Sequence, residues 1–204
     1  MHKKLWLLIF SDIFILSGFG LIAPIFAVFI NNNLVGGSLI AAGLATTIFL
    51  IVKSAVQLPL SKYFIDKHDH KASFIVAGTF LIISVPFIYA AAKDVHTIFI
   101  AQAVYGLGTA LAYPAWFSLF TMYMDKKHRG FEYTVYTTSI GVGTALAAFF
   151  GANIAAVLGF RTLFFVVGFI SFLGFLFLIV LYRLELKNSR SGNFPNHPFN
   201  KIKK

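Results

Sequence analysis

The stretch QLPLSKYFIDKHDHK, from Gln57 to Lys71, lies between two long apolar runs and decides how the chain folds. Lys62, Lys67 and Lys71 carry its positive charges, and Asp66 is one of its acids. Charged side chains and irregular backbone are strongly disfavoured in hydrocarbon, where water cannot satisfy them. We therefore interpret this stretch as a tight cytoplasmic hinge between two transmembrane helices.

The composition of the chain is that of a membrane protein. Of its 204 residues, 58% are hydrophobic and 12% are charged, and the mean hydropathy is +0.82. Soluble domains have about 25% charged residues. Cysteine is absent, which excludes disulfides and thiolate metal sites. The net charge of +10 would favour nucleic acid only if the basic residues shared one water-exposed face.

Six apolar runs are long enough to cross a hydrocarbon core of about 30 Å, which takes about 20 helical residues. We expect transmembrane helices near residues 5–30, 38–62, 72–92, 96–122, 133–158 and 162–184. No Ser- or Pro-rich linker separates these runs. The sequence therefore predicts one six-helix unit over residues 1–186. A basic, disordered cytoplasmic tail is predicted over 187–204, in contact with either water or anionic lipid headgroups.

Lysine and arginine predict the orientation, because positively charged loops stay in the cytoplasm. Fourteen of the 17 lie at the N-terminus, between the second and third runs, between the fourth and fifth runs, or after residue 182. Lys93 and Arg161 lie on the opposite side, and Lys53 lies within a span. Both termini are therefore predicted to be cytoplasmic. The same distribution argues against a nucleic-acid partner.

The first and fourth runs share a Gly-x-Gly pair followed by a proline. Gly18 and Gly20 precede Pro24, and a second pair, 106–108, precedes Pro114. Such a pattern weakens and bends a helix. Each of these runs opens a group of three, so we predict a 3+3 inverted repeat, which is common in transporters. Chance is the alternative, because glycine and proline are frequent in membrane helices.

The hinge after the second run resembles the loop between helices two and three of the major facilitator superfamily (MFS). In that family the loop resembles Gly-x-x-x-Asp-Arg-x-Gly-Arg-Arg/Lys. Asp66 and Lys67 match its Asp-Arg pair, and His70 and Lys71 match its closing basic pair. Other residues stand at both glycine positions. Arg129-Gly130, at the start of the fifth run, also resembles a family landmark, and the resemblance covers about residues 5–186.

The resemblance implies an all-α membrane protein with one six-helix half of the MFS fold. It also implies a secondary transporter of a small solute, with or without a coupling ion, working by alternating access as a dimer of halves in a prokaryotic plasma (inner) membrane. The expected gating-loop residues are Asp66, Lys67, His70, Lys71 and Arg129. The alternatives are a membrane scaffold or assembly subunit that transports nothing, and a fragment or one chain of a split twelve-helix transporter.

Asp12 and Lys53 are the full charges that lie well inside predicted spans, and intramembrane charges mark functional sites by default. Lys53 could instead extend to the interface, and Asp12 could cap or bond locally with Ser11. Polar side chains follow at helical spacing, which would line a cavity or satisfy one another within the bundle. The candidates for substrate or coupling-ion contact are Asp12, Lys53, Gln57, Gln102, Tyr105, Thr109 and Tyr113.

Small residues recur at every fourth position of the fifth run. Such spacing lets two helix backbones approach closely, so it predicts a packing seam. The members are Gly143, Ala147, Gly151, Ala155 and Gly159. The sequence has no His-Glu-x-x-His, Gly-x-Ser-x-Gly or Walker motif, so we expect no enzyme, no cofactor and no metal.

Overall fold

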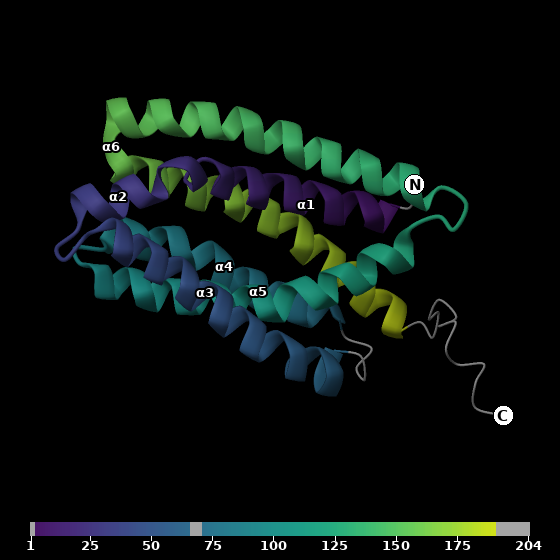
Figure 1. Cartoon of the computed structure of the whole chain (residues 1–204). Coiled ribbons are helices and arrows are strands. Elements are labelled where there is room, and N and C mark those ends of the chain that lie inside the picture. Colours follow the sequence, from purple (N-terminus) through teal and green to yellow (C-terminus); the bar gives the residue numbers. More distant parts are fainter. Residues whose placement is uncertain (1–2, 66–70, 191–204) are drawn as a thin grey trace.

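Long apolar helices lie side by side along the molecule (Figure 1). The computed structural model describes residues 3–65 and 71–190. Its elements are α1 (Lys3–Gly20), the 3-10 turn η1 (Ala23–Ile25), α2 (Phe26–Asn33), α3 (Leu39–Leu60), the π-helical turn η2 (Ser61–Ile65), α4 (Lys71–Ala91), α5 (Val95–Tyr123) and α6 (Arg129–Arg190).

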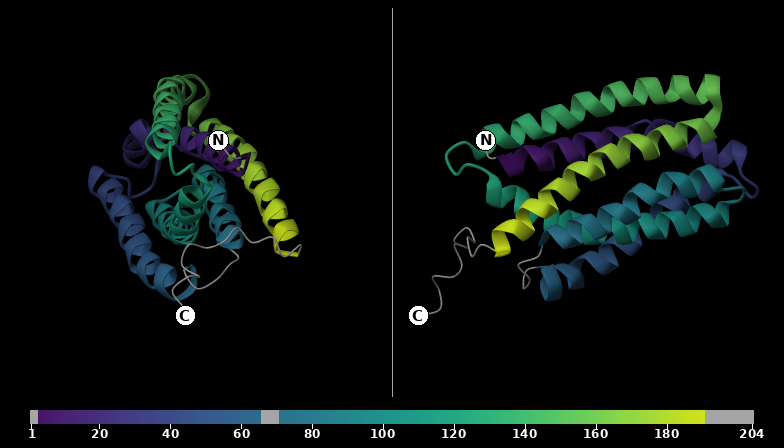
Figure 2. Two further views of the ribbon diagram at one scale, coloured as in Figure 1. Left: turned by 90° about the vertical axis from the view of Figure 1, so that its right-hand side faces the viewer. Right: turned by 180° about the vertical axis from the view of Figure 1, so that it is seen from behind.

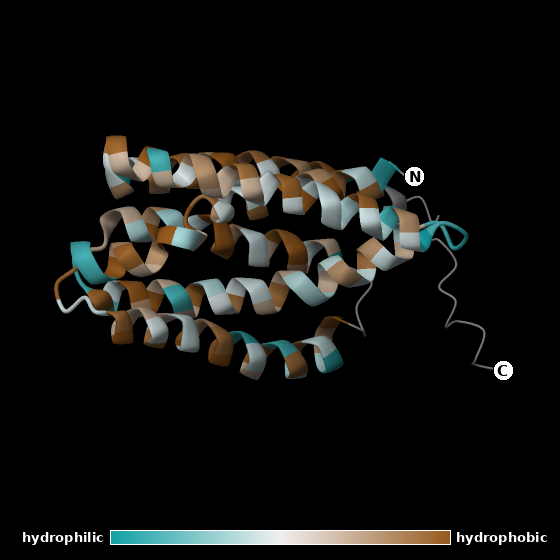
Figure 3. Ribbon diagram, turned by 45° about the horizontal axis from the view of Figure 1, so that its top comes forward, coloured by the Kyte–Doolittle hydropathy of each residue, from teal (hydrophilic) through white to brown (hydrophobic). Residues whose placement is uncertain are grey.

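Within the described residues, five helical segments are long and apolar enough to cross a membrane. They are Lys3–Asn33, Leu39–Ile65, Lys71–Ala91, Val95–Tyr123 and Arg129–Lys187. The first four match the predicted spans to within a few residues. Hydrophobic residues predominate along the lengths of the helices, and hydrophilic residues are most evident towards the ends (Figure 3). Ile40 and Val157, for example, are 84% and 80% exposed, as expected for lipid-facing residues. The chain is an all-α integral membrane protein.

The last two predicted spans lie in α6, which reverses direction at Gly159. The backbone there is not helical, with φ 82° and ψ 162°, a conformation that glycine adopts without a steric penalty. The first arm of α6, residues 129–158, and its second arm, residues 160–190, run back alongside each other (Figures 1 and 2). An added Cβ at Gly159 would meet no atom within 4 Å, so this glycine serves the reversal and is not a packing residue.

Proline interrupts the first span but not the later ones. Pro24 lies in η1, where the helix loosens between α1 and α2. Proline lacks a backbone N–H, which breaks the ladder of helical hydrogen bonds. Pro59, Pro86 and Pro114 lie inside continuous helices, and membrane helices tolerate this where neighbouring groups satisfy the freed carbonyl.

Two interhelical connections pair with each other at one end of the bundle. The Val35 N–H donates to the Lys93 carbonyl at 3.0 Å, and the Val95 N–H donates to the Val35 carbonyl at 3.2 Å. The beginning of α1 and the turn before α6 lie at the opposite end (Figure 1). Lys93 and Lys127 therefore lie at opposite ends of the bundle. Which end faces the cytoplasm remains a prediction from the charges.

The helices pack as two groups. Helix α1 packs against both arms of α6, while α3 and α4 pack against α5, and α4 also contacts α6. Glycine permits the closest approaches between them. An added Cβ at Gly151 in the first arm would lie 2.0 Å from the Leu21 carbonyl oxygen. An added Cβ at Gly78 in α4 would lie 2.5 Å from the Gly108 carbonyl oxygen in α5.

Candidate functional site

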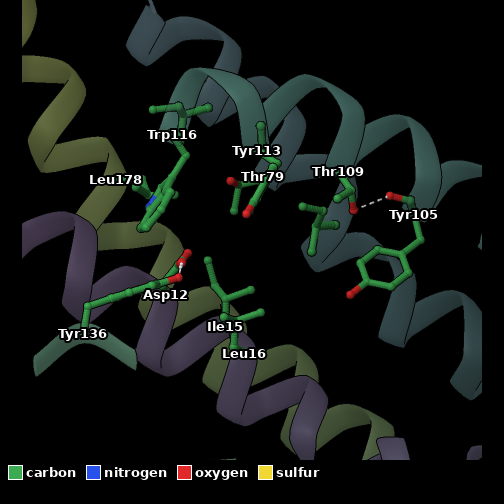
Figure 4. Close-up of a pocket in the computed structure, with 13 residues that line it drawn as sticks. Asp12, Ile15, Leu16, Thr79, Tyr105, Thr109, Tyr113, Trp116, Tyr136 and Leu178 are labelled. Carbon is green, nitrogen blue, oxygen red and sulfur yellow. Dashed lines mark hydrogen bonds between the residues drawn. The ribbon is translucent and has the colours of Figure 1, made fainter. Parts of the chain in front are cut away.

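A cavity of about 120 Å³ lies between α1, α4, α5 and α6 (Figure 4). Its lining combines one carboxylate, that of Asp12, with four aromatic side chains. These are Tyr105, Tyr113 and Trp116 from α5 and Tyr136 from the first arm of α6. Thr79 and Thr109 add hydroxyl groups, and the remaining lining is apolar. We call this space the Asp12 cavity.

Asp12 is held by a hydrogen bond from a distant part of the chain. The Tyr136 hydroxyl donates to Asp12 Oδ2 at 2.8 Å (Figure 4). Ser11 does not bond to Asp12. Its hydroxyl donates instead to the Leu8 carbonyl at 2.7 Å. The contact found for Asp12 therefore joins α1 to α6, and the local bond with Ser11 is not formed.

Trp116 lies in the wall of the Asp12 cavity and contains a buried donor without a partner. Its side chain is buried, and its indole Nε1 has no hydrogen-bond partner. The indole is fixed by a stacked ring contact with Phe120 at 4.6 Å and a tilted contact with Tyr136 at 5.2 Å between centroids. A buried donor without a partner costs about 1–3 kcal/mol.

Lys53 lies on α3 outside the Asp12 cavity. Its Nζ is 5.5 Å from the centroid of the Tyr113 ring and 5.9 Å from that of Phe49. These are cation–π distances. No ion pair joins Lys53 to Asp12, both of which the structure describes. Tyr113 lines the cavity and contacts the ammonium, so one aromatic ring links the two charged residues.

A second cavity, of about 180 Å³, lies on the other side of Tyr105. Its lining is Phe19, Ile22, Ala23, Phe26, Tyr89, Gln102 and Tyr105. The Gln102 side chain is buried and its Oε1 has no partner. Tyr105 lines both cavities. Its ring stacks between Phe19 at 4.9 Å and Phe49 at 4.6 Å.

The predicted cavity residues thus divide into three sets. Asp12, Tyr105, Thr109 and Tyr113 line one cavity. Gln102 lines the second cavity. Lys53 and Gln57 are partly exposed residues of α3 that line neither cavity.

Two of the predicted gating-loop residues can be placed. Lys71 begins α4, and its buried side chain donates to Ser118 Oγ of α5 at 2.6 Å. Arg129 begins α6 and is exposed. Asp66, Lys67 and His70 lie outside the described residues.

Some of the small residues in the first arm of α6 pack against α1 and the turn that follows it. An added Cβ at Gly143 would lie 2.4 Å from Ser17 Oγ, and Gly151 meets Leu21. Ala147 is buried, with its Cβ 3.4 Å from the position of an added Cβ at Gly20, and Ala155 is partly buried.

Sequence reasoning did not find three features of this structure. Thr79 and Tyr136 line the Asp12 cavity. Lys4 forms an ion pair with Glu185 of the second arm at 2.5 Å, and the Tyr123 hydroxyl also donates to Glu185. The sequence shows each of these polar residues next to or within an apolar run. It does not show which residue each one contacts, because Lys4 and Glu185, for example, are 181 residues apart. Among the described residues, no cluster of three or more His, Cys, Asp or Glu could hold a metal.

A bundle of apolar helices around a cavity with one carboxylate is an integral membrane protein with a polar internal site. The family model of the Major Facilitator Superfamily matches residues 5–203. The chain belongs to this superfamily, whose members are membrane transporters and not enzymes. The family predicted from the hinge and helix motifs is therefore confirmed.

A solved structure with a similar fold is that of the peptide transporter POT, a point mutant in complex with alafosfalin. The two structures superpose with a TM-score of 0.75 at 20% sequence identity, over 98% of this chain and 43% of that chain. At this identity the likeness shows the fold alone. The chain matches less than half the length of that transporter, so its fold is about half of an MFS fold. The curated proteins include no match to this sequence.

Proposed function

We propose that the chain is a six-helix half of a secondary transporter that moves a small solute by alternating access. The Asp12 cavity is the observation that carries this proposal. A carboxylate within a membrane span is costly, and such residues mark substrate or ion pathways. The family identity supports the same function. Both termini are proposed to be cytoplasmic, from the distribution of lysine and arginine.

Six crossings follow if each arm of α6 is counted as one helix, because the chain reverses at Gly159. The packing then favours an inverted repeat. The first helix packs against the fifth and sixth, and the fourth helix, α5, packs against the second and third. Gly18 and Gly20 contact the two arms of α6, while Gly106 and Gly108 contact α3 and α4. Gly18 contacts the later arm and Gly20 the earlier one, whereas Gly106 contacts the earlier helix, α3, and Gly108 the later one, α4. The repeat therefore relates whole helices, and the individual glycines do not correspond.

The second half is proposed to be another copy of the chain. MFS halves are related by an axis along the membrane normal, so two parallel copies can form a closed two-fold dimer. The Asp12 cavity reaches the surface at Tyr113, which is 50% exposed, and Lys53 is partly exposed beside it. A Lys in lipid costs about 2.5–3.5 kcal/mol. A partner that covers this face would remove that cost.

The resemblance also suggests where the two halves meet at the cytoplasmic end. Asp66 of one protomer is proposed to approach Arg129 and the start of the first arm near Phe131 in the other protomer. Arg129 is exposed and Phe131 is 68% exposed, so both are accessible to a partner. N–H groups at the start of a helix favour an anion. The alternatives are a different six-helix half, or a non-transporting assembly subunit.

Transport is tested by screening solutes for uptake into proteoliposomes and for thermal stabilisation of the purified protein. Asp12→Asn should fold but lose uptake of any solute that the wild type carries. Asp125→Asn is the matched control, because Asp125 is an exposed carboxylate between α5 and α6. Uptake that Asp12→Asn leaves unchanged would refute the role of the cavity. Partner binding that depends on Asp12, without flux of any solute, would favour the assembly subunit.

Assembly is tested with cysteines introduced at positions 66 and 131 on separate chains. The natural sequence contains no cysteine, so any crosslink must join the introduced pair. A crosslinked dimer is expected. A strictly monomeric mass in nanodiscs, with transport intact, would refute the dimer and leave the transport proposal standing.

A further inference from the structure

We propose that the Asp12 cavity binds a small organic cation, with the ammonium group between the Asp12 carboxylate and the surrounding aromatic rings. This inference rests on the proposed function and names its class of solute. It draws on the charge of the cavity, the chemistry of its walls, a cation already bound to one wall, and its volume.

The cavity carries a negative group and no positive one. Asp12 is the carboxylate in its lining, and no Lys, Arg or His is among the described residues that line it. The hydrogen bond that Asp12 accepts comes from Tyr136, a neutral phenol. An ionised carboxylate away from water is strongly unfavourable unless a positive group pairs with it. In its ionised form the site therefore attracts a cation and repels an anion, and a neutral solute gains nothing from the charge.

The walls of the cavity suit an ammonium group. Tyr136 and Trp116 lie close to Asp12, Tyr113 lies further along the same wall, and Tyr105 lines the far end of the cavity (Figure 4). The face of an aromatic ring attracts a cation within about 6 Å of its centroid, and tryptophan and tyrosine do so most strongly. Aromatic rings around a carboxylate are the chemistry that recognises alkylated ammonium groups.

One of these walls already holds a primary ammonium in the structure. The Lys53 Nζ lies 5.5 Å from the centroid of Tyr113, which is a cavity residue. The ring therefore accepts a cation of the proposed type. Lys53 also places a like charge near the entrance, which opposes a second cation. Removal of the Lys53 charge should consequently strengthen the binding of an organic cation, whereas it would weaken the binding of an anion.

The volume limits the size of the cation. The cavity measures about 120 Å³, while pockets for drug-sized ligands are about 300–1,000 Å³. It therefore accepts a small ammonium compound or the ammonium end of a longer one. The Trp116 ring lies in the wall beside Asp12 (Figure 4), so it limits the width of the cavity there.

Choline and its uncharged carbon isostere, dimethylbutanol, provide a matched pair of probes. They share a shape and a hydroxyl group, and only choline carries charge. The chain contains two tryptophans, so Trp6→Phe leaves Trp116, in the cavity wall, as the fluorescent reporter. Choline should change the Trp116 emission in a saturable way in purified full-length protein. Dimethylbutanol should require a concentration roughly tenfold higher or more, as expected when a charge pair and cation–π contacts are lost.

Substitutions in the Trp6→Phe background identify the groups responsible. Asp12→Asn should weaken choline binding about tenfold or more, Asp12→Glu should retain it, and the Asp125→Asn control should not change it. Lys53→Met should strengthen choline binding several-fold. If Asp12→Asn does not fold, the preference for choline over dimethylbutanol still tests the inference, and so do the choline affinities of Asp12→Glu and Lys53→Met.

Equal affinity for the two probes, or weaker choline binding in Lys53→Met, would overturn the inference. Full choline affinity in Asp12→Asn would also overturn it. The two proposals fail in different ways. Transport of a neutral or anionic solute that depends on Asp12 would support the transporter and refute the cation site. Selective choline binding without flux of any solute would support the cation site and refute the transporter.

Discussion

Replacing Gly151 with alanine tests how closely the first arm of α6 packs against α1. The added Cβ would lie 2.0 Å from the Leu21 carbonyl oxygen and 2.7 Å from the Leu21 carbonyl carbon and Cα. Nonbonded carbon atoms are most favourable at about 3.5–4.0 Å, so the helices must separate by roughly 1 Å or more. The obstructing atoms belong to the backbone and cannot rotate away. The substitution therefore forces a shift of the helix axis.

Overpacking of this kind costs about 1–3 kcal/mol. For a chain of this length, that free energy lowers the melting temperature by about 2–12 °C. Thermal unfolding of the purified protein in detergent measures the change. Gly141→Ala is the control on the same arm, because an added Cβ there meets no atom within 4 Å. The control should melt at or slightly above the wild-type temperature. If Gly151→Ala has the same melting temperature as the Gly141→Ala control, the close approach of α1 and α6 is wrong.

Three further predictions concern orientation and local charges. A cysteine at Asn32 should react with an impermeant thiol reagent outside intact cells, and one at Lys127 should not; labelling at 127 would reverse the topology. Glu185→Gln should lower the stability by about 1–3 kcal/mol, because a buried lysine on α1 loses its charged partner, and an unchanged melting temperature would contradict this. The backbone N–H of Thr97, above all, holds the pKa of the Asp94 carboxyl below its ordinary value. This helix cap should therefore be fully effective above about pH 4 and lost as the pH falls further. The melting temperature of the wild type should then fall more steeply below about pH 4 than that of Asp94→Asn, and parallel profiles would exclude the effect.

The helices could be predicted from the sequence because each apolar run is long and ends at charged or glycine-rich residues. The predicted boundary near residue 159 is the point where the chain reverses. The site could be predicted only in part. Helical spacing places Gln102 and Tyr113 on one helix, but it does not say what packs across from them. Phe19 stacks on Tyr105 from another helix and helps divide the predicted stripe between two cavities. Contacts of that kind depend on tertiary packing.

The stacking of Tyr105 determines how fast the wall between the two cavities can move. A free aromatic side chain at a cavity wall changes rotamer in picoseconds to nanoseconds. The Tyr105 ring cannot do so while Phe19 and Phe49 cover its two faces. Those two rings belong to α1 and α3, so the Tyr105 ring moves only when helices separate, which takes microseconds to milliseconds. The wall that the two cavities share is therefore as rigid as the packing of the three helices α1, α3 and α5.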